Sequence, residues 1–489
     1  MKHEHELAVM ADQCSAVGRS GVVCAAAPLA AQAGAAALRA GGNAYDAVVA
    51  AGLAETVLLP PKCGFGGDLI AIRLASGATE PDALLAIGGA PAGLAAVARG
   101  GSWRDVGPMS VGPPAVAHGY AALAALGRLG RERLAAPAIE LAVEGFPWAA
   151  VCADLSAQAR SLVLEMNPHG CDYFPGGFPI AAGDIVRLPG LAAVLREFVE
   201  RGAQLMDGPV GLAVVEAVNS RGGVLTQADF AHARAEWVAC ATGTVATVDG
   251  PLTTWATPAP THGPSLLDAV SGVRSDDPGP AGLLREVLRA IDARRSILSD
   301  PSGTSMVSAA DAEGNVVVLV HSNSFPRYGS GIIVPEYSLP LANRAGRGFT
   351  PEIGHPNFPV AGRRPATTLH AWAVAGSDGR PRFLGATPGG ANQMPWNAQT
   401  IHRIAQGVAH PGMLVSAPIW EWLPADDGVR VEHGFDPAEL EALREAASRI
   451  VDAPRWGCRS AQQVVRVPQQ GGAWVAAADP RTVGLALGV

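Results

Sequence analysis

The sequence predicts a compact α/β protein, and three observations carry this prediction. Hydrophobic residues make up 48% of the 489 residues and charged residues only 16%, which is ample for a large core and argues against disorder. Segments with apolar residues at helical spacing alternate with short runs of β-branched or apolar residues, and glycine-containing turns flank these runs. No internal repeat and no low-complexity linker divides the chain, so we expect one interleaved globular unit.

Two consecutive helices are predicted near the start of the chain. Residues 28–40 have helical character, and Gly41-Gly42 ends this helix because glycine tolerates the left-handed conformation at the C′ position. Asn43 then caps a second helix that runs to about residue 58, with Asp46 near its positive dipole end.

A glycine turn and a strand follow this helix pair. The turn covers residues 63–68, and the alternating residues 69–74 predict the strand. The turn does not fit a dinucleotide-binding GxGxxG pattern, because Leu69 stands at the position of the last glycine and the turn leads into a strand and not into a helix.

The middle of the chain is predicted to be mainly helical. Apolar residues recur at helical spacing in residues 115–129, 134–145, 191–202 and 283–298, and Thr226 opens a further short helix. Residues 245–256 and the prolines after them predict a strand followed by a loop.

A β-hairpin is predicted after residue 303. Residues 304–310 form an extended run, 311–315 carry a strong turn pattern, and 316–320 are β-branched and apolar. The short stretch 299–303 before the hairpin contains Asp, Pro, Ser and Gly, so it is a possible processing boundary.

Composition excludes several classes of function. The net charge is −8 and no basic tract interleaves with aromatic residues, so we expect no nucleic-acid partner. Residues 1–17 lack an apolar signal-peptide region, and Pro28, Gln32, Gly34 and Arg39 interrupt the Ala-rich run 22–40, so we expect neither secretion nor a membrane span. The seven cysteines form no CxxC pair, which favours reduced thiols in a cytoplasmic protein. The twelve histidines form no spaced ligand set, and we expect no metal and no cofactor.

Thr304 is the most informative candidate for chemistry. A threonine hydroxyl is a weak nucleophile unless a base lies next to it, and a free α-amino group on the same residue can be that base. This arrangement requires cleavage of the Gly303–Thr304 bond, and the unhindered Gly303 before a strand is a plausible place for it. On the local pattern alone, a hairpin without chemistry is the better explanation of these residues.

A resemblance that runs along the chain favours the chemical interpretation. The segment GTSMVSAADAEGN, residues 303–315, resembles the first strand and turn of the small subunit of gamma-glutamyltranspeptidases, whose pattern there is Thr-Thr-His-x-Ser-Val-Val-Asp-x-x-Gly-Asn. Similar stretches follow the family's order at residues 28–46, 64–69, 144–146, 226–230, 257–260, 329–332, 363–365, 367–368, 387–390 and 477–481. Ordered matches over this length are specific, although no single one would be.

The resemblance implies a fold and a division of the chain. The implied fold is the four-layer αββα sandwich of the N-terminal-nucleophile hydrolases. Residues 1–303 would form the large chain and residues 304–489 the small chain after self-cleavage, together building one domain. A homo-oligomer is possible.

The resemblance also implies roles for individual residues. Thr304 would be the nucleophile in self-cleavage and in attack on a small-molecule substrate. Gly389 and Gly390 match the backbone donors that stabilise the oxyanion. Ser322 and Asn323 lie near the family's polar support residues, with an uncertain register, and ordinary strand-end polar groups would explain them too.

The departures from the family pattern concentrate at substrate recognition. The arginine expected before the Ala90-Pro91 pair is missing, and the acidic pair that would grip an α-amino group is replaced by the segment with Arg344 and Arg347. Arginines at this place repel an ammonium group and favour an anionic substrate such as a keto acid or a dicarboxylate, although solvated loop arginines are the plainer alternative. The polar pair survives as Thr367-Thr368.

These features are similar to the cytosolic gamma-glutamyltranspeptidase-like branch. That branch includes amidohydrolases of oxamate-type compounds and homologues that cut a C–C bond in the biosynthesis of alkylproline units of antibiotics. We therefore expect a hydrolase or acyltransferase that acts on a small anionic, non-glutamyl substrate, at an amide or at a C–C bond next to a carbonyl. The alternatives are a true gamma-glutamyl hydrolase or transferase and an unprocessed, non-catalytic homologue.

Two substitutions bear on maturation. Met306 replaces the family's histidine two residues after the nucleophile, and the segment before Gly303 is shorter than in the family. Both keep the unprocessed alternative open. His321, His370 and His402 are expected to be structural or surface residues.

Overall fold

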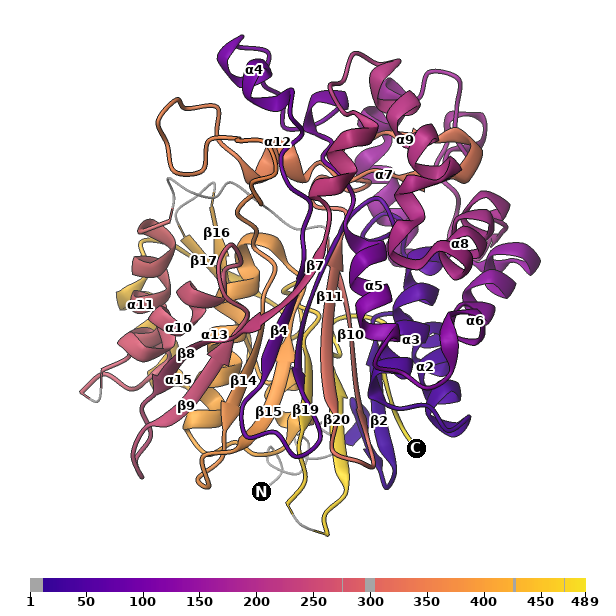
Figure 1. Cartoon of the computed structure of the whole chain (residues 1–489). Helices are drawn as coiled ribbons and strands as arrows, with labels where there is room; N and C mark the ends of the chain where they lie inside the picture. Colours follow the sequence, from indigo (N-terminus) through magenta and orange to yellow (C-terminus); the bar gives the residue numbers. More distant parts are fainter. Residues whose placement is uncertain (1–11, 275, 295–303, 425–427, 470) are drawn as a thin grey trace.

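The computed structural model describes residues 12–274, 276–294, 304–424, 428–469 and 471–489. Two seven-stranded antiparallel sheets lie face to face in this part of the chain (Figure 1). The first sheet has the order β21 (Leu485–Gly488), β2 (Gly21–Ala25), β10 (Thr304–Asp311), β11 (Val316–Ser322), β3 (Asp68–Leu74), β4 (Asp82–Ala86) and β7 (Ala235–Ala239). The second has the order β1 (Ser15–Gly18), β20 (Trp474–Ala478), β19 (Gln463–Arg466), β15 (Pro381–Ala386), β14 (Ala371–Ala375), β9 (Leu252–Ala256) and β8 (Ala241–Val245).

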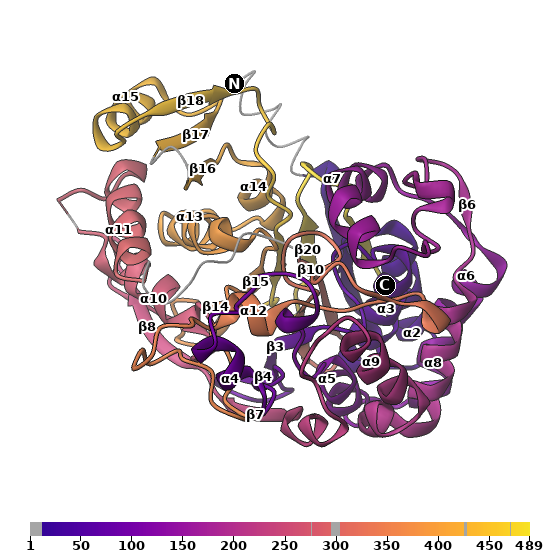
Figure 2. The ribbon, with the colours of Figure 1, turned by 90° about the horizontal axis from the view of Figure 1, so that it is seen from above.

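Helices cover the outer face of each sheet. Against the first sheet lie α2 (Pro28–Arg39), α3 (Ala44–Leu58) and α5 (Val116–Ala124), with α6 (Gly130–Glu144) and α8 (Pro189–Arg201) packed behind them. Against the second sheet lie α10 (Gly263–Gly272), α13 (Gln393–Ala405) and α14 (Pro411–Ser416), with α11 (Pro280–Asp292) outside them. Viewed from above, the two helical groups stand on opposite sides of the sheets (Figure 2). The predicted four-layer αββα sandwich is confirmed.

Three apolar clusters correspond to the three interfaces between these layers. One, which includes Met306, Ile70 and Ala373, lies between the two sheets. The other two fill the space between each sheet and its helices. The central strands β10 and β11 are therefore buried along their whole length, and apolar residues dominate β11.

The helix pair near the start of the chain forms as predicted. Asn43 Oδ1 accepts the N–H groups of Tyr45 and Asp46, and an Asp46 carboxylate oxygen accepts the Asn43 N–H, which completes a capping box. The predicted helix 115–129 ends earlier, at Ala124, because the Asp46 carboxylate also accepts the N–H groups of Arg128 and Leu129 and holds that segment in a turn.

Other predicted elements differ in detail. The short helix opened by Thr226 is a 3₁₀ turn, Gln227–His232, with a capping box between Thr226 and Asp229. Residues 245–256 do not form one strand as predicted. They contain the last residue of β8, a turn around Thr247 and Gly250, and the whole of β9. The helix predicted at 283–298 begins at Pro280 and ends at Asp292, and residues 295–298 lie outside the described residues. The hairpin 304–320 forms as β10 and β11.

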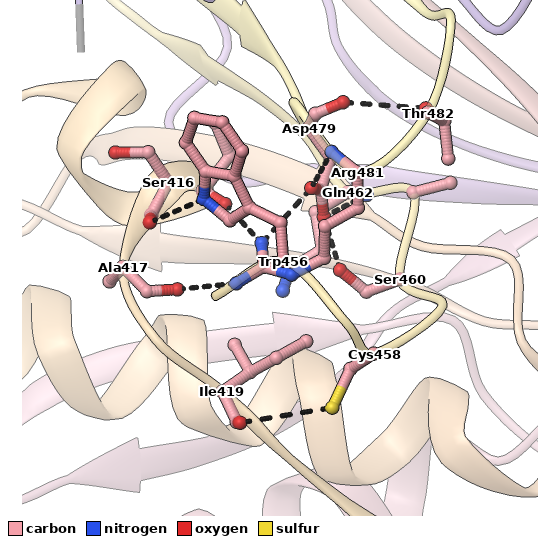
Figure 3. A network of polar contacts seen from close by, with 12 residues as sticks. Ser416, Ala417, Ile419, Trp456, Cys458, Ser460, Gln462, Asp479, Arg481 and Thr482 are labelled. Atoms are coloured by element: carbon pink, nitrogen blue, oxygen red, sulfur yellow. Dashed lines mark hydrogen bonds and ion pairs between the residues drawn. The ribbon is translucent and has the colours of Figure 1, made fainter. Parts of the chain in front are cut away.

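A buried polar network holds the closing segment of the chain (Figure 3). The Arg481 guanidinium lies against the carboxylates of Glu432 and Asp479, and all three side chains are fully buried. The same guanidinium donates to the backbone carbonyls of Val415 (2.8 Å) and Ala417 (2.7 Å). Arg481 thus joins the end of the chain to α14 and to the small sheet β16 (Trp420–Leu423), β17 (Gly428–Glu432) and β18 (Ile450–Ala453).

In the described residues, no helix is long and apolar enough to cross a membrane.

Candidate active site

Thr304, Ser322 and Asp68 stand in one row across three neighbouring strands. Thr304 on β10 pairs with Ser322 on β11, and Ser322 pairs with Asp68 on β3. Two residues further along, Met306 and Ile70 belong to the cluster between the sheets. Because side chains on a strand alternate between its faces, the three polar side chains also face the second sheet, at the end of the sandwich.

Thr304 is held by hydroxyl contacts. Its side chain is buried, with 2% of the residue exposed, and Oγ1 donates to Ser322 Oγ at 3.2 Å. Ser322 Oγ also accepts the backbone N–H of Ser324 at 2.9 Å. Ser324 has a positive φ of 66°, which turns its N–H back toward the end of the strand. Ser322 therefore receives two donors and fixes the rotamer of the threonine.

Asn323 lies on the other side of this strand end. Its backbone N–H donates to the Lys62 carbonyl (2.9 Å), and its Nδ2 donates to the Pro60 carbonyl (3.2 Å). It also packs on the glycine turn: a Cβ on Gly67 would lie 2.8 Å from Asn323 Oδ1 and 2.1 Å from the Ser322 carbonyl oxygen. The glycine is needed here because the turn passes directly against the backbone of β11. Asn323 thus supports the glycine turn beside the end of β11.

The second sheet contributes the turn after β15. Gly389 has φ +146° and Gly390 has φ +58°, and a Cβ on Gly389 would lie 2.2 Å from the Trp396 ring. Glycine at 389 thus permits both the backbone conformation and the close packing against α13. The turn comes close to Thr304 through Gln393, the first residue of α13, whose side-chain amide lies 3.5 Å from Thr304 Oγ1.

Gln393 also reaches the loop that carries the predicted polar pair. Its Nε2 donates to the Thr368 carbonyl at 3.0 Å, and its Oε1 accepts the Gly390 N–H at 3.1 Å. Thr367 and Thr368 are both buried, and the Thr367 N–H donates to the Pro260 carbonyl at 3.0 Å. The structure thus brings Thr304, Ser322, Gly390 and Thr368 together around one glutamine.

A buried histidine fixes the same loop. His370 Nδ1 donates to the Thr368 carbonyl (2.8 Å), because Asn397 Nδ2 lies 2.8 Å from the other ring nitrogen and donates to it. Burial lowers the pKa of His370 to about 4, so the ring is neutral near pH 7. The Gly389–Gly390 turn, the Thr368 loop and α13 are therefore held in one network of neutral hydrogen bonds.

Arg344 is buried and forms an ion pair with Asp68. Its Nε donates to Asp68 Oδ2 at 2.9 Å, and Asp68 Oδ1 accepts the Gly88 N–H at 3.0 Å. Both side chains are less than 5% exposed. Burial raises the pKa of Asp68, and the adjacent guanidinium opposes this shift. Arg344 is thus not a solvated loop residue, and Asp68 balances its charge beside the row that contains Thr304.

Arg347 belongs to a group of cationic side chains around Phe325. Its Nη1 lies 3.4 Å from Asp105 Oδ2, and its guanidinium lies 5.8 Å from the centre of the Phe325 ring. Arg327 lies 5.6 Å from the same ring. Burial and the charge of Arg459 lower the pKa of Arg327 to about 10, and burial and the charge of Arg327 lower the pKa of Lys62. Arg327 and Arg347 thus lie on the same aromatic ring, and Arg327 also acts on Lys62.

The other predicted histidines are structural. His321 is fully buried, with Nε2 2.8 Å from Glu55 Oε2 and Nδ1 2.8 Å from the Tyr120 hydroxyl. Within the described ranges, Glu55, Cys63 and His321 place three potential ligand atoms within 4.8 Å of one another. Both His321 nitrogens already have partners, so this group acts as a hydrogen-bond network of the core. His402 is also buried, at 7% exposed.

Sequence reasoning missed the roles of Gln393, Ser324 and Asp68. Gln393 begins α13, a helix that was not predicted, although Met394, Ala398, Ile401 and Ala405 recur at helical spacing and could have indicated it. Asp68 ends the glycine turn that the sequence analysis identified, and its proximity to Arg344 depends on a contact across 276 residues.

Comparison with known proteins places this site in a family. The pattern of the family described as gamma-glutamyltranspeptidase matches residues 30–278 and 285–489. The chain is 25% identical to the glutathione hydrolase-like YwrD proenzyme of Bacillus subtilis, over 97% of this chain and 99% of that protein. It is also 25% identical to the oxamate amidohydrolase proenzyme of Klebsiella pneumoniae, over 97% of this chain and 99% of that protein.

A solved structure agrees with this assignment. The cephalosporin acylase of Bacillus halodurans superposes with a TM-score of 0.85 at 25% identity, covering 97% of each chain. Family pattern, relatives and fold coincide over nearly the whole length. The chain is therefore an enzyme of the gamma-glutamyltranspeptidase family, with the N-terminal-nucleophile hydrolase fold.

Proposed function

We propose that this chain is a self-cleaving N-terminal threonine hydrolase or acyltransferase whose substrate is a small anion and not a gamma-glutamyl compound. The observation that carries the proposal is the position of Thr304. Its hydroxyl lies at the first residue of a central strand, bonded to Ser322 and close to the Gly390 turn of the opposite sheet. A nucleophile and backbone donors for the oxyanion thus face one another across the end of the sandwich.

Maturation would divide the chain into residues 1–303 and 304–489. Thr304 Oγ1 would add to the carbonyl carbon of Gly303, a residue outside the described ranges. The C–N bond would break with a proton passing to nitrogen, which leaves an ester, and water would hydrolyse that ester to a carboxylate and a free hydroxyl. The α-amino group released on Thr304 would then be the base for the next reaction.

Turnover would use the same hydroxyl. The α-amino group would take the proton from Oγ1 as the oxygen attacks the substrate carbonyl, and the N–H groups of the Gly389–Gly390 turn would stabilise the negative charge on the carbonyl oxygen. The leaving group would depart with a proton, and water or an acceptor would release the acyl group. The same electrophilic carbonyl could lose an amine or a carbon leaving group, so C–C cleavage for an alkylproline pathway remains one branch of the proposal.

The preference for an anion rests on the charges around the site. Arg327 and Arg347 lie against Phe325, the residue after Ser324, and Arg327 contributes to the lowered pKa of Lys62. An ammonium group placed among these cations would be repelled. Oxamate, which the name of one relative specifies, is an anionic amide of the expected kind. A gamma-glutamyl substrate would instead have to place its α-ammonium among these cations.

The intact mass of wild-type protein, measured beside Thr304→Ala, tests the maturation step. We expect two wild-type fragments that meet at Gly303–Thr304 and an uncleaved alanine variant. A wild-type chain that stays whole would favour the unprocessed, non-catalytic alternative, in which Met306 and the short preceding segment prevent maturation.

A matched pair of anilides tests the substrate class. Glutaric acid mono-p-nitroanilide and gamma-glutamyl-p-nitroanilide differ only in the α-ammonium group. We expect the first to be turned over with a kcat/KM at least about tenfold higher, since one unfavourable charge contact costs about 1.4 kcal/mol or more. Preference for the gamma-glutamyl compound would support the classical activity instead. Oxamate, with ammonia release as readout, completes the panel.

A further inference from the structure

The Gln393 side chain lies between Thr304 Oγ1 and the Gly390 N–H, where the proposed reaction would place the substrate carbonyl oxygen. The side chain is fully buried, between Thr304, the Gly390 turn and the Thr368 loop. Only one orientation of the amide satisfies its neighbours: Nε2 must face the Thr368 carbonyl, and Oε1 must face the Gly390 N–H. The end of the amide that carries the oxygen is therefore 3.1 Å from the Gly390 nitrogen and 3.5 Å from Thr304 Oγ1.

These are the neighbours expected of the oxygen of a bound acyl group. An oxyanion lies 2.7–3.1 Å from its donors and next to the attacking oxygen. We propose that the Gln393 amide oxygen is a placeholder for the carbonyl oxygen of the substrate. In the free enzyme the amide oxygen accepts the Gly390 N–H, and an acyl substrate displaces it on binding. This inference rests on the proposed function of Thr304 and goes beyond it by assigning a residue that competes with the substrate.

The surroundings show which part has to move. The Gly389–Gly390 turn is packed against Trp396 so closely that no Cβ fits at Gly389, and the Thr368 carbonyl is held by His370. The Gln393 side chain, in contrast, is attached to these two groups by one hydrogen bond each. Displacement of the side chain exchanges a neutral hydrogen bond at Gly390 for one to the substrate, and the backbone donors stay in place.

The placeholder also gives the Gly390 N–H a hydrogen-bond acceptor when no substrate is bound. An unpaired donor in a buried site destabilises the fold. Gln393 satisfies the Gly390 N–H in the absence of substrate. The consequence is a weaker apparent affinity, because each substrate molecule competes with the attached amide.

Two variants of Gln393 test this competition. In Gln393→Met the Gly390 N–H has no competing acceptor, so we expect the KM for glutaric acid mono-p-nitroanilide to fall by about threefold or more while kcat stays within about threefold. In Gln393→Glu the carboxylate accepts the Gly390 N–H more strongly when it is ionised. The protonated acid can donate to the Thr368 carbonyl as glutamine does. We therefore expect kcat/KM of this variant to fall as pH rises through the titration of the introduced carboxyl, by more than about tenfold.

The controls are Gln406→Met and Gln406→Glu, at the exposed end of the same helix, which should keep the wild-type constants. Acylation of Thr304 by p-nitrophenyl acetate, followed by intact mass, repeats the comparison with an activated ester. A wild type that neither cleaves itself nor is acylated contradicts the proposed function. If the wild type cleaves itself and is acylated, the proposed function stands. The placeholder inference alone is then overturned if Gln393→Met has an unchanged or raised KM and Gln393→Glu has the wild-type pH profile.

Discussion

The Thr304 hydroxyl donates a hydrogen bond of 3.2 Å to the Ser322 hydroxyl across the β10–β11 ladder. Ser322→Ala removes this acceptor and frees the threonine rotamer, so we expect self-cleavage and acylation to slow by about tenfold, as loss of one hydrogen bond of about 1.4 kcal/mol predicts. Time courses of intact mass measure both rates.

Ser305→Ala is the matched control for this variant. Ser305 is the next residue on β10 and pairs with His321 on the opposite, helix-facing side of the sheet. Its replacement removes the same hydroxyl from a fully buried site but leaves the Thr304 contact intact. Equal rate losses in the two variants would show that Ser322 acts only through the packing of the sheet.

Arg344→Met should destabilise the fold because it leaves the Asp68 carboxylate buried without its ion-pair partner. Removing one member of a buried pair costs about 3–5 kcal/mol, and replacing both members can cost much less. We therefore expect Asp68→Asn with Arg344→Met to lose less stability than Arg344→Met alone. Urea unfolding measures the three free energies. A double variant that loses the sum of the single losses would argue against direct coupling.

Arg481→Met tests the network that closes the C-terminal segment. The guanidinium contacts Glu432 and Asp479, and all three side chains are fully buried (Figure 3), so we expect a loss of about 3–5 kcal/mol in the free energy of unfolding. Arg444→Met is the control, because Arg444 and Glu441 form an exposed pair worth less than about 1 kcal/mol. Similar losses in both variants would contradict the importance of burial here.

Stability should fall as the pH is lowered from 6.5 to 4, in part through His370. Burial lowers the pKa of His370 from 6.5 to about 4, so the unfolded chain binds a proton in this range before the folded chain does. Protonation therefore favours unfolding, by up to about 3 kcal/mol for this residue. The contribution is fully present above pH 6.5 and lost toward pH 4.

His370→Asn checks this assignment. Asparagine can still donate to the Thr368 carbonyl but does not titrate, so the unfolding free energy should change less steeply between pH 6.5 and 4. The buried His402, whose pKa burial also lowers to about 4, leaves some slope in the variant. The exposed His169→Asn should keep the wild-type slope. A wild-type slope in His370→Asn would rule out the histidine as a source.

Local patterns predicted much of the fold. The capping box of Asn43 and Asp46 and the hairpin around residues 311–315 form as expected, because their hydrogen bonds join residues a few positions apart. The early end of α5 at Ala124 was not predictable in this way, since it depends on Asp46, about eighty residues away. The α13 helix was missed although Met394, Ala398, Ile401 and Ile404 form an apolar stripe that packs against the second sheet.

The sequence by itself determined the family, the nucleophile candidate Thr304 and the glycine pair at 389 and 390, because these depend on residue identity and order along the chain. The tertiary structure decided how these residues meet. The pairing of the two sheets brings Gln393 to Thr304 across 89 positions and Arg344 to Asp68 across 276. Such contacts arise from packing between layers, which no local propensity encodes, and they determine which side chains surround Thr304.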